Sequence, residues 1–106
     1  MEVCIAHIRG KPVMLGLVDG IVTIDGEMQP IKGLTEEQLA DFAAQVSAIP
    51  YSPDPGYKAL VNARRAAFLA SLLGRAVGDD CVNRVSHILD HVHMDVLEYL
   101  GEDVPQ

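Results

Sequence analysis

The sequence has few aromatic residues and no long uninterrupted apolar stretch. Its 106 residues include no tryptophan, two phenylalanines and three tyrosines, so aliphatic side chains must fill the interior. The longest strongly apolar stretch without a charge or a histidine, residues 66–74, is far shorter than the roughly 18–20 residues of a membrane span. The first residues contain neither a basic segment nor a signal-peptide apolar run. We therefore expect a cytoplasmic protein that does not enter a membrane.

Cysteine is also scarce. Cys4 and Cys81 lie among apolar neighbours and lack the Cys-x-x-Cys spacing of many metal and redox sites. We expect both to be small buried side chains in a reducing compartment. The sequence leaves open whether the two pair as a disulfide.

Composition and charge indicate one globular domain over residues 1–106, with 49% hydrophobic residues and a formal net charge of −7. Charge is unevenly distributed: residues 57–78 contain four basic and no acidic side chains, whereas residues 79–106 contain seven acidic and one basic. Contacts to phosphate dominate the affinity of proteins for nucleic acids, and they require basic side chains. We therefore expect that this acidic chain does not bind nucleic acids directly.

The first third of the chain, residues 1–34, predicts an antiparallel β-meander of three to four strands. Residues 3–8 alternate in a period of two, which places Val3, Ile5 and His7 on one face. Two further runs, residues 13–18 and 21–24, are joined by Asp-Gly, a strong hairpin signal. A second Asp-Gly predicts a short fourth strand over residues 28–31, which Pro30 restricts to the sheet edge.

The remainder predicts three helices, over residues 35–47, 55–77 and 80–100, which gives an α+β fold. Thr35 and Gln38 have the spacing of a capping box, and Asp54 can cap the second helix. The second helix is apolar nearly all round, with Arg64, Ser71 and Arg75 as its polar stripe, so we expect it to be buried on several sides. The third helix has an apolar seam and pairs with the second as an antiparallel hairpin. Residues 35–101 are then the helical part, and residues 102–106 are a loose acidic tail.

One cluster on the third helix has the composition of a metal site. His87 and His91 lie four residues apart and so share a helix face, and Asp95 and Glu98 follow near that face. Neutral imidazoles with a carboxylate could bind zinc or another divalent ion. The glutamate of a His-Glu-x-x-His motif is missing, so a polar, histidine-rich surface is the competing interpretation. We expect His93, near the apolar seam, to be half-buried.

No catalytic pattern is present. The serines lack the Gly-x-Ser-x-Gly context of a nucleophile elbow, and the glycines do not form a phosphate-binding loop. The paired acids at residues 36–37 and 79–80 have the positions of helix starts.

We therefore expect a non-enzymatic protein without a cofactor that binds a macromolecular partner as an inhibitor, an antitoxin- or immunity-type neutraliser, an adaptor or an assembly factor. The candidate partner-binding residues are Glu98, Glu102, Asp103, Arg64 and Arg75. The three acids would steer a basic protein, and the apolar second helix predicts a homodimer. The alternatives are a metal- or small-ligand-binding protein that uses the histidine face, and a non-catalytic subunit of a larger complex.

Overall fold

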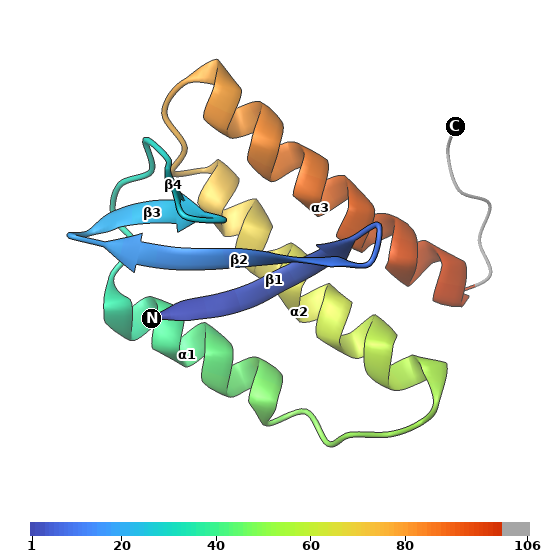
Figure 1. The fold of residues 1–106 in the computed structure, drawn as a ribbon. Helices are drawn as coiled ribbons and strands as arrows, with labels where there is room; N and C mark the ends of the chain where they lie inside the picture. The colour runs from blue at the N-terminus through green and yellow to red at the C-terminus, as the bar shows by residue number, and fades with distance from the viewer. Residues whose placement is uncertain (101–106) are drawn as a thin grey trace.

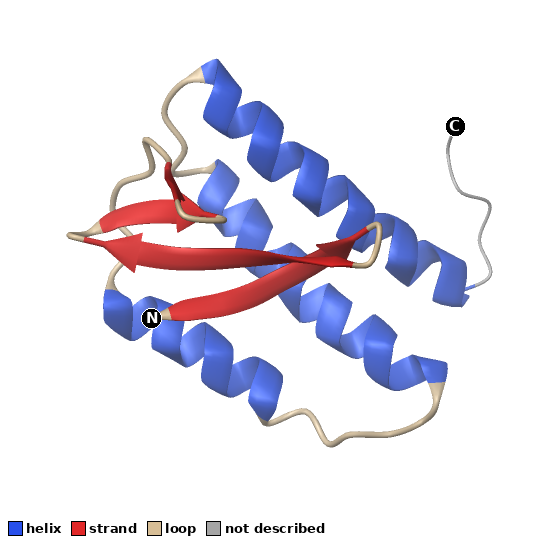
Figure 2. Ribbon diagram, viewed as in Figure 1, coloured by secondary structure: helices blue, strands red, loops and turns tan. Residues whose placement is uncertain are grey.

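Four antiparallel strands form one sheet, and three helices cover one of its faces (Figure 1). This computed structural model describes residues 1–100. The elements are β1 Glu2–Ile8, β2 Lys11–Val18, β3 Ile21–Ile24, β4 Glu27–Met28, α1 Glu36–Ser47, α2 Pro55–Leu73 and α3 Asp79–Leu100. The sheet order is β1-β2-β3-β4, and α2 lies behind the sheet with α1 and α3 on either side (Figure 2). The predicted α+β fold is confirmed.

Tight turns join the strands because the sequence places residues there that accept a positive φ. Asp19 and Gly20 have φ values of 52° and 79°, and Asp25 and Gly26 have 51° and 83°. A two-residue turn with positive φ at both positions has the twist that antiparallel strands require, so each Asp-Gly pair closes a hairpin as predicted. The third such turn, Arg9–Gly10, has the same geometry.

β1 does not follow the predicted alternation. Its register pairs Cys4 and Ala6 with the adjacent residues 14 and 13 of β2, so one residue of β1, Ile5, is extra. This β-bulge buries Ile5 and Ala6 together, although they are consecutive. The prediction that His7 shares a face with Ile5 is therefore wrong. Beyond the bulge, His7 lies on the same face as Cys4.

The hydrophobic core lies between the sheet and the helices, and α2 is its central helix. The fully buried larger side chains come from every layer: Ile5, Leu15, Val22, Ile24, Ile31, Leu39, Leu69, Leu72 and Val85. α2 and α3 pack closely along their length, which confirms the predicted hairpin. Within residues 1–100, no helix has both the length and the hydropathy needed to cross a membrane.

The predicted capping box at the start of α1 is present. Thr35 Oγ1 accepts a hydrogen bond from the Gln38 backbone N–H at 3.1 Å, and Gln38 Oε1 accepts one from the Thr35 N–H at 3.0 Å. These two bonds satisfy donors that a helix start otherwise leaves free. Asp54 occupies the N-cap position of α2, but its side chain makes no capping bond there.

α2 ends at Leu73, four residues earlier than predicted. After it, Ala76 forms an isolated β-bridge with Ile31, and the Val77 N–H donates to the Pro30 carbonyl oxygen at 3.1 Å. An extended segment that pairs with residues 30–31 cannot continue a helix, which explains the early end. The same pairing restricts the predicted fourth strand to Glu27–Met28 plus this single bridge.

The two cysteines are free thiols in different surroundings. Cys81 is a buried residue in the first turn of α3, and burial raises the pKa of its thiol. Cys4 is only half-buried, so the expectation of two buried cysteines holds for one of them.

Candidate functional site

The main candidate site is a groove between α1 and α2, called here the α1–α2 groove, with a cavity volume of about 360 Å³. Ten residues line it: Leu34, Gln38, Asp41, Phe42, Gln45, Arg64, Ala67, Phe68, Ser71 and Arg75. Phe42 of α1 and Phe68 of α2 stack at its floor, with ring centroids 4.2 Å apart and an interplanar angle of 17°. The two phenylalanines of the chain thus join the helices and form an apolar base.

Arg64 and Arg75 both line this groove. Arg64 lies on α2, and Arg75 lies two residues beyond the end of α2 at Leu73. Arg75 Nη1 donates to Ser71 Oγ at 2.9 Å, so that guanidinium lies beside Ser71. Ser71 follows Arg64 by seven residues, which corresponds to about two turns and about 10 Å along the helix axis. Asp41 is the one acidic residue among the ten lining residues. The groove is therefore apolar at its floor and net positive at its walls.

α2 is buried on several sides, as expected, but it is not covered all round. Its side toward the sheet and α3 is buried, but Leu60 is 48% exposed and three alanines on the same side, Ala63, Ala67 and Ala70, are also exposed. We call these four residues the α2 stripe. It borders the α1–α2 groove through Ala67, which belongs to both. The apolar surface predicted from the sequence is present and stays open in the single chain.

A second hollow, the Asn62 pocket, has a volume of about 460 Å³ and lies where the β1–β2 turn, α2 and α3 meet. Asn62 is 4% exposed, and its Nδ2 donates to Asp95 Oδ2 at 3.3 Å. Arg65 Nη1 donates to Asn62 Oδ1 at 3.4 Å, while Arg65 Nε is buried without a partner among the described residues. His7 and Lys58 also line this pocket.

Sequence reasoning missed the Asn62 network. The available signal was an amide within an otherwise apolar stretch, residues 59–63 of α2. A buried amide needs hydrogen-bond partners, because an unsatisfied one costs about 1–3 kcal/mol. Its partner Asp95 lies on another helix, so the pairing was not visible in local spacing.

The candidate metal residues on α3 are not all directed to one point. The rings of His87 and His91 meet edge to face, with centroids 4.8 Å apart. Asp95 accepts its hydrogen bond from Asn62 of α2, and Glu98 is exposed. Over residues 1–100, no three side chains of histidine, cysteine, aspartate or glutamate come together as a metal-binding group. The geometry thus adds no support to the zinc interpretation.

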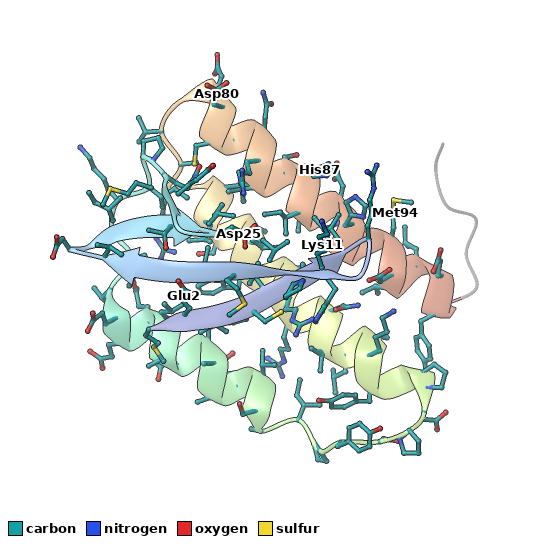
Figure 3. All side chains as sticks on the ribbon, viewed as in Figure 1. Glu2, Lys11, Asp25, Asp80, His87 and Met94 are labelled. Atoms are coloured by element: carbon teal, nitrogen blue, oxygen red, sulfur yellow. The ribbon has the colours of Figure 1, made fainter. Side chains whose placement is uncertain are left out.

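His87 instead borders a hollow of about 350 Å³ between α3 and the sheet, which Lys11, Asp25 and Arg84 also line. The side chains of His87, Lys11 and Asp25 are labelled in Figure 3. Arg84 Nη2 lies 3.5 Å from Asp25 Oδ2, and Arg84 Nη1 lies 3.3 Å from Glu27 Oε2. These ion pairs attach α3 to the β3–β4 turn. His93 is exposed, so its predicted half-burial is wrong.

Glu98, the acidic partner-binding candidate within the described residues, lies away from the arginines. Glu98 is exposed on α3, which lies across α2 from α1 (Figure 1). Glu102 and Asp103 lie outside the described residues. Of the three candidates within residues 1–100, the two arginines share a groove and Glu98 does not line it.

Comparison with known proteins identifies no relative of this chain. No family model matches the sequence, and no curated protein or solved structure matches it either. The functional proposals below therefore depend on this chain's own geometry and charge.

Proposed function

We propose that this protein is a non-enzymatic cytoplasmic binding domain whose α1–α2 groove docks an acidic, amphipathic helical segment of a protein partner. One observation carries the proposal: two guanidinium groups flank a groove that has an apolar floor and only one carboxylate among its lining residues. Inhibitors, neutralisers, adaptors and assembly factors all act through such a surface. The proposal gives the groove no chemistry of its own.

The groove supplies both parts of a helix-docking surface. Phe68 and Ala67 present apolar atoms, and the α2 stripe continues that surface along the helix. An amphipathic helix places apolar anchors three, four and seven residues apart into such a groove. The guanidinium of Arg75 lies beside Ser71, about two helical turns from Arg64. Acidic residues about seven positions apart on the partner would then reach both guanidinium groups.

Charge favours a different protein over a second copy of α2. Arg64 lies on the exposed side of α2, Arg75 follows the end of α2, and the segment from residue 57 to residue 78 contains no acid. Two α2 helices packed face to face would bring like charges together, which opposes association. The homodimer predicted from the sequence stays a prediction, and the experiment below treats it as a competing occupant. The basic partner predicted for the acidic residues would need another surface, around Glu98.

The test uses two labelled 15-residue amphipathic peptides with the same leucine face. One carries glutamates seven residues apart, and the other carries lysines at those positions. Fluorescence anisotropy should show that the glutamate peptide binds and that Arg64→Gln with Arg75→Gln weakens it about tenfold or more. Lys32→Gln, which removes an exposed cation outside the groove, is the matched control and should leave binding unchanged. Binding should also weaken as salt rises.

Three results would overturn the proposal. The first is equal affinity for the two peptides, and the second is no binding of the glutamate peptide at millimolar concentration. The third is a dimer in light scattering that Ala67→Glu dissociates, because the groove would then belong to a second copy of the chain.

A further inference from the structure

The sheet has one face that α1, α2 and α3, the helices of residues 1–100, leave uncovered (Figure 1). Strand register places Glu2, Cys4, His7, Met14, Gly16 and Thr23 on it, together with Pro12, Val18, Ile21 and Met28. A Cβ atom built on Gly16 would lie 2.9 Å from Thr23 Oγ1 and 3.0 Å from Glu2 Cγ, which confirms that these side chains crowd the same face. This face is formed by the strands, whereas the α1–α2 groove lies between two helices.

Three potential soft-metal ligands meet on this face. In a regular strand, residues three apart point to opposite faces, so Cys4 and His7 would be separated by the sheet. The bulge at Ile5 reverses this relation and brings Cys4 Sγ within 4.0 Å of both ring nitrogens of His7. Met14 is the direct cross-strand partner of Cys4, so their Cβ atoms are about 4.5–5.5 Å apart. Cys4 and Met14 are both half-buried.

The spacing is close to what one bound ion requires. Metal–sulfur bonds of about 2.3 Å and metal–nitrogen bonds of about 2.0 Å put the two ligand atoms about 3.5–3.8 Å apart at tetrahedral to trigonal angles. The observed 4.0 Å therefore needs a shift of a few tenths of an ångström and a rotation of the His7 ring.

We propose that Cys4, His7 and Met14 form a three-ligand site for a monovalent soft metal ion, Cu(I). Thiolate and thioether sulfur select Cu(I), and imidazole is compatible with it, whereas divalent hard ions prefer oxygen. Binding breaks the Cys4 S–H bond, releases that proton to solvent and forms a copper–sulfur bond without any change of oxidation state. The thiolate and the ion then cancel in charge, which suits a half-buried position. The second ring nitrogen of His7 keeps its proton.

The test titrates Cu(I) into the full chain without oxygen, in competition with the chromophoric chelator bicinchoninate. We expect one ion per chain and an X-ray absorption spectrum with two sulfur ligands and one nitrogen ligand. Cys4→Ser should weaken binding by about 100-fold or more, and Met14→Leu and His7→Gln by about tenfold each, because each removes a ligand. Cys81→Ala, at the buried cysteine, is the matched control and should bind like the unmodified chain. Circular dichroism verifies that each variant is folded.

Several outcomes would overturn the site. Half an ion per chain would indicate a thiolate bridge between two copies. Unchanged affinity in Cys4→Ser, or loss of binding in Cys81→Ala, would place the ion elsewhere. Zn(II) binding as tight as Cu(I) binding and insensitive to Met14→Leu would exclude the soft, thioether-containing ligand set.

Discussion

Replacement of Asn62 by alanine should destabilise the protein by about 2–3 kcal/mol. Asn62 bridges two charged side chains, because it donates to Asp95 at 3.3 Å and accepts from Arg65 at 3.4 Å. A hydrogen bond to a charged group contributes about 1.5–3 kcal/mol, and these long bonds belong at the lower end. Asp95 and Arg65 are half-buried, so water can recover part of the loss in the variant.

Urea denaturation followed by circular dichroism measures this loss as a lower midpoint with an unchanged slope. In a chain of this size, 2 kcal/mol corresponds to a fall in melting temperature of about 8–16 °C. Asn83→Ala, at an exposed position of α3, is the matched control and should change stability by less than about 0.5 kcal/mol. A cycle that combines Asn62→Ala with Asp95→Ala should give a coupling energy of about 1 kcal/mol.

A second substitution separates the hydrogen bonds from simple packing. Asn62→Leu removes the same bonds but adds apolar atoms at a buried position. If the network stabilises the fold, this variant is also less stable than the unmodified protein. A stabilising Asn62→Leu, or a loss below about 0.5 kcal/mol for Asn62→Ala, would refute the reasoning, since both imply that the partners do not need the amide.

Three other changes have definite expected outcomes. Leu69→Ala, at a fully buried position of α2, should lower the free energy of unfolding by about 2–5 kcal/mol in urea denaturation. Leu60→Ala, at a half-exposed position of the same helix, should lower it by less than about 1 kcal/mol, and equal losses would contradict the described core. Iodoacetamide followed by mass spectrometry should modify Cys4 in the native protein at pH 8 but Cys81 only after unfolding, because burial shields Cys81 and raises its pKa. Arg84→Ala should cost no more than about 1–2 kcal/mol, because both of its ion pairs are partly exposed, and 0.5 M salt should reduce that cost; a larger, salt-insensitive loss would show that packing dominates.

Local sequence determined the elements whose stabilising contacts lie within a few residues. The Asp-Gly pairs specify their hairpins because both central residues must adopt positive φ, which few other pairs tolerate. Thr35 and Gln38 specify the start of α1 because each side chain satisfies the other's backbone donor. Alternation and helical spacing of apolar residues then sufficed for the α+β class and for the α2–α3 hairpin.

Tertiary structure decided every feature that depends on a partner distant in the chain. α2 ends at Leu73 with Gly74 as its C-cap, and Ala76 then pairs with Ile31, a partner more than forty residues away that local sequence does not indicate. Asp95 was placed with the histidines by its spacing, but it faces α2, where Asn62 donates to it.

The two proposed sites have the same origin. The sequence indicated only that Arg64 and Arg75 share a polar stripe. The groove beside them exists because α1 packs against α2 and stacks Phe42 on Phe68. Cys4 and His7 meet only because the bulge changes the alternation of β1. The helical and strand periods determine which residues of one element share a face. Which faces of different elements meet, and where a register shifts, depends on the free energy of packing over the whole core, which the local pattern of residues does not contain.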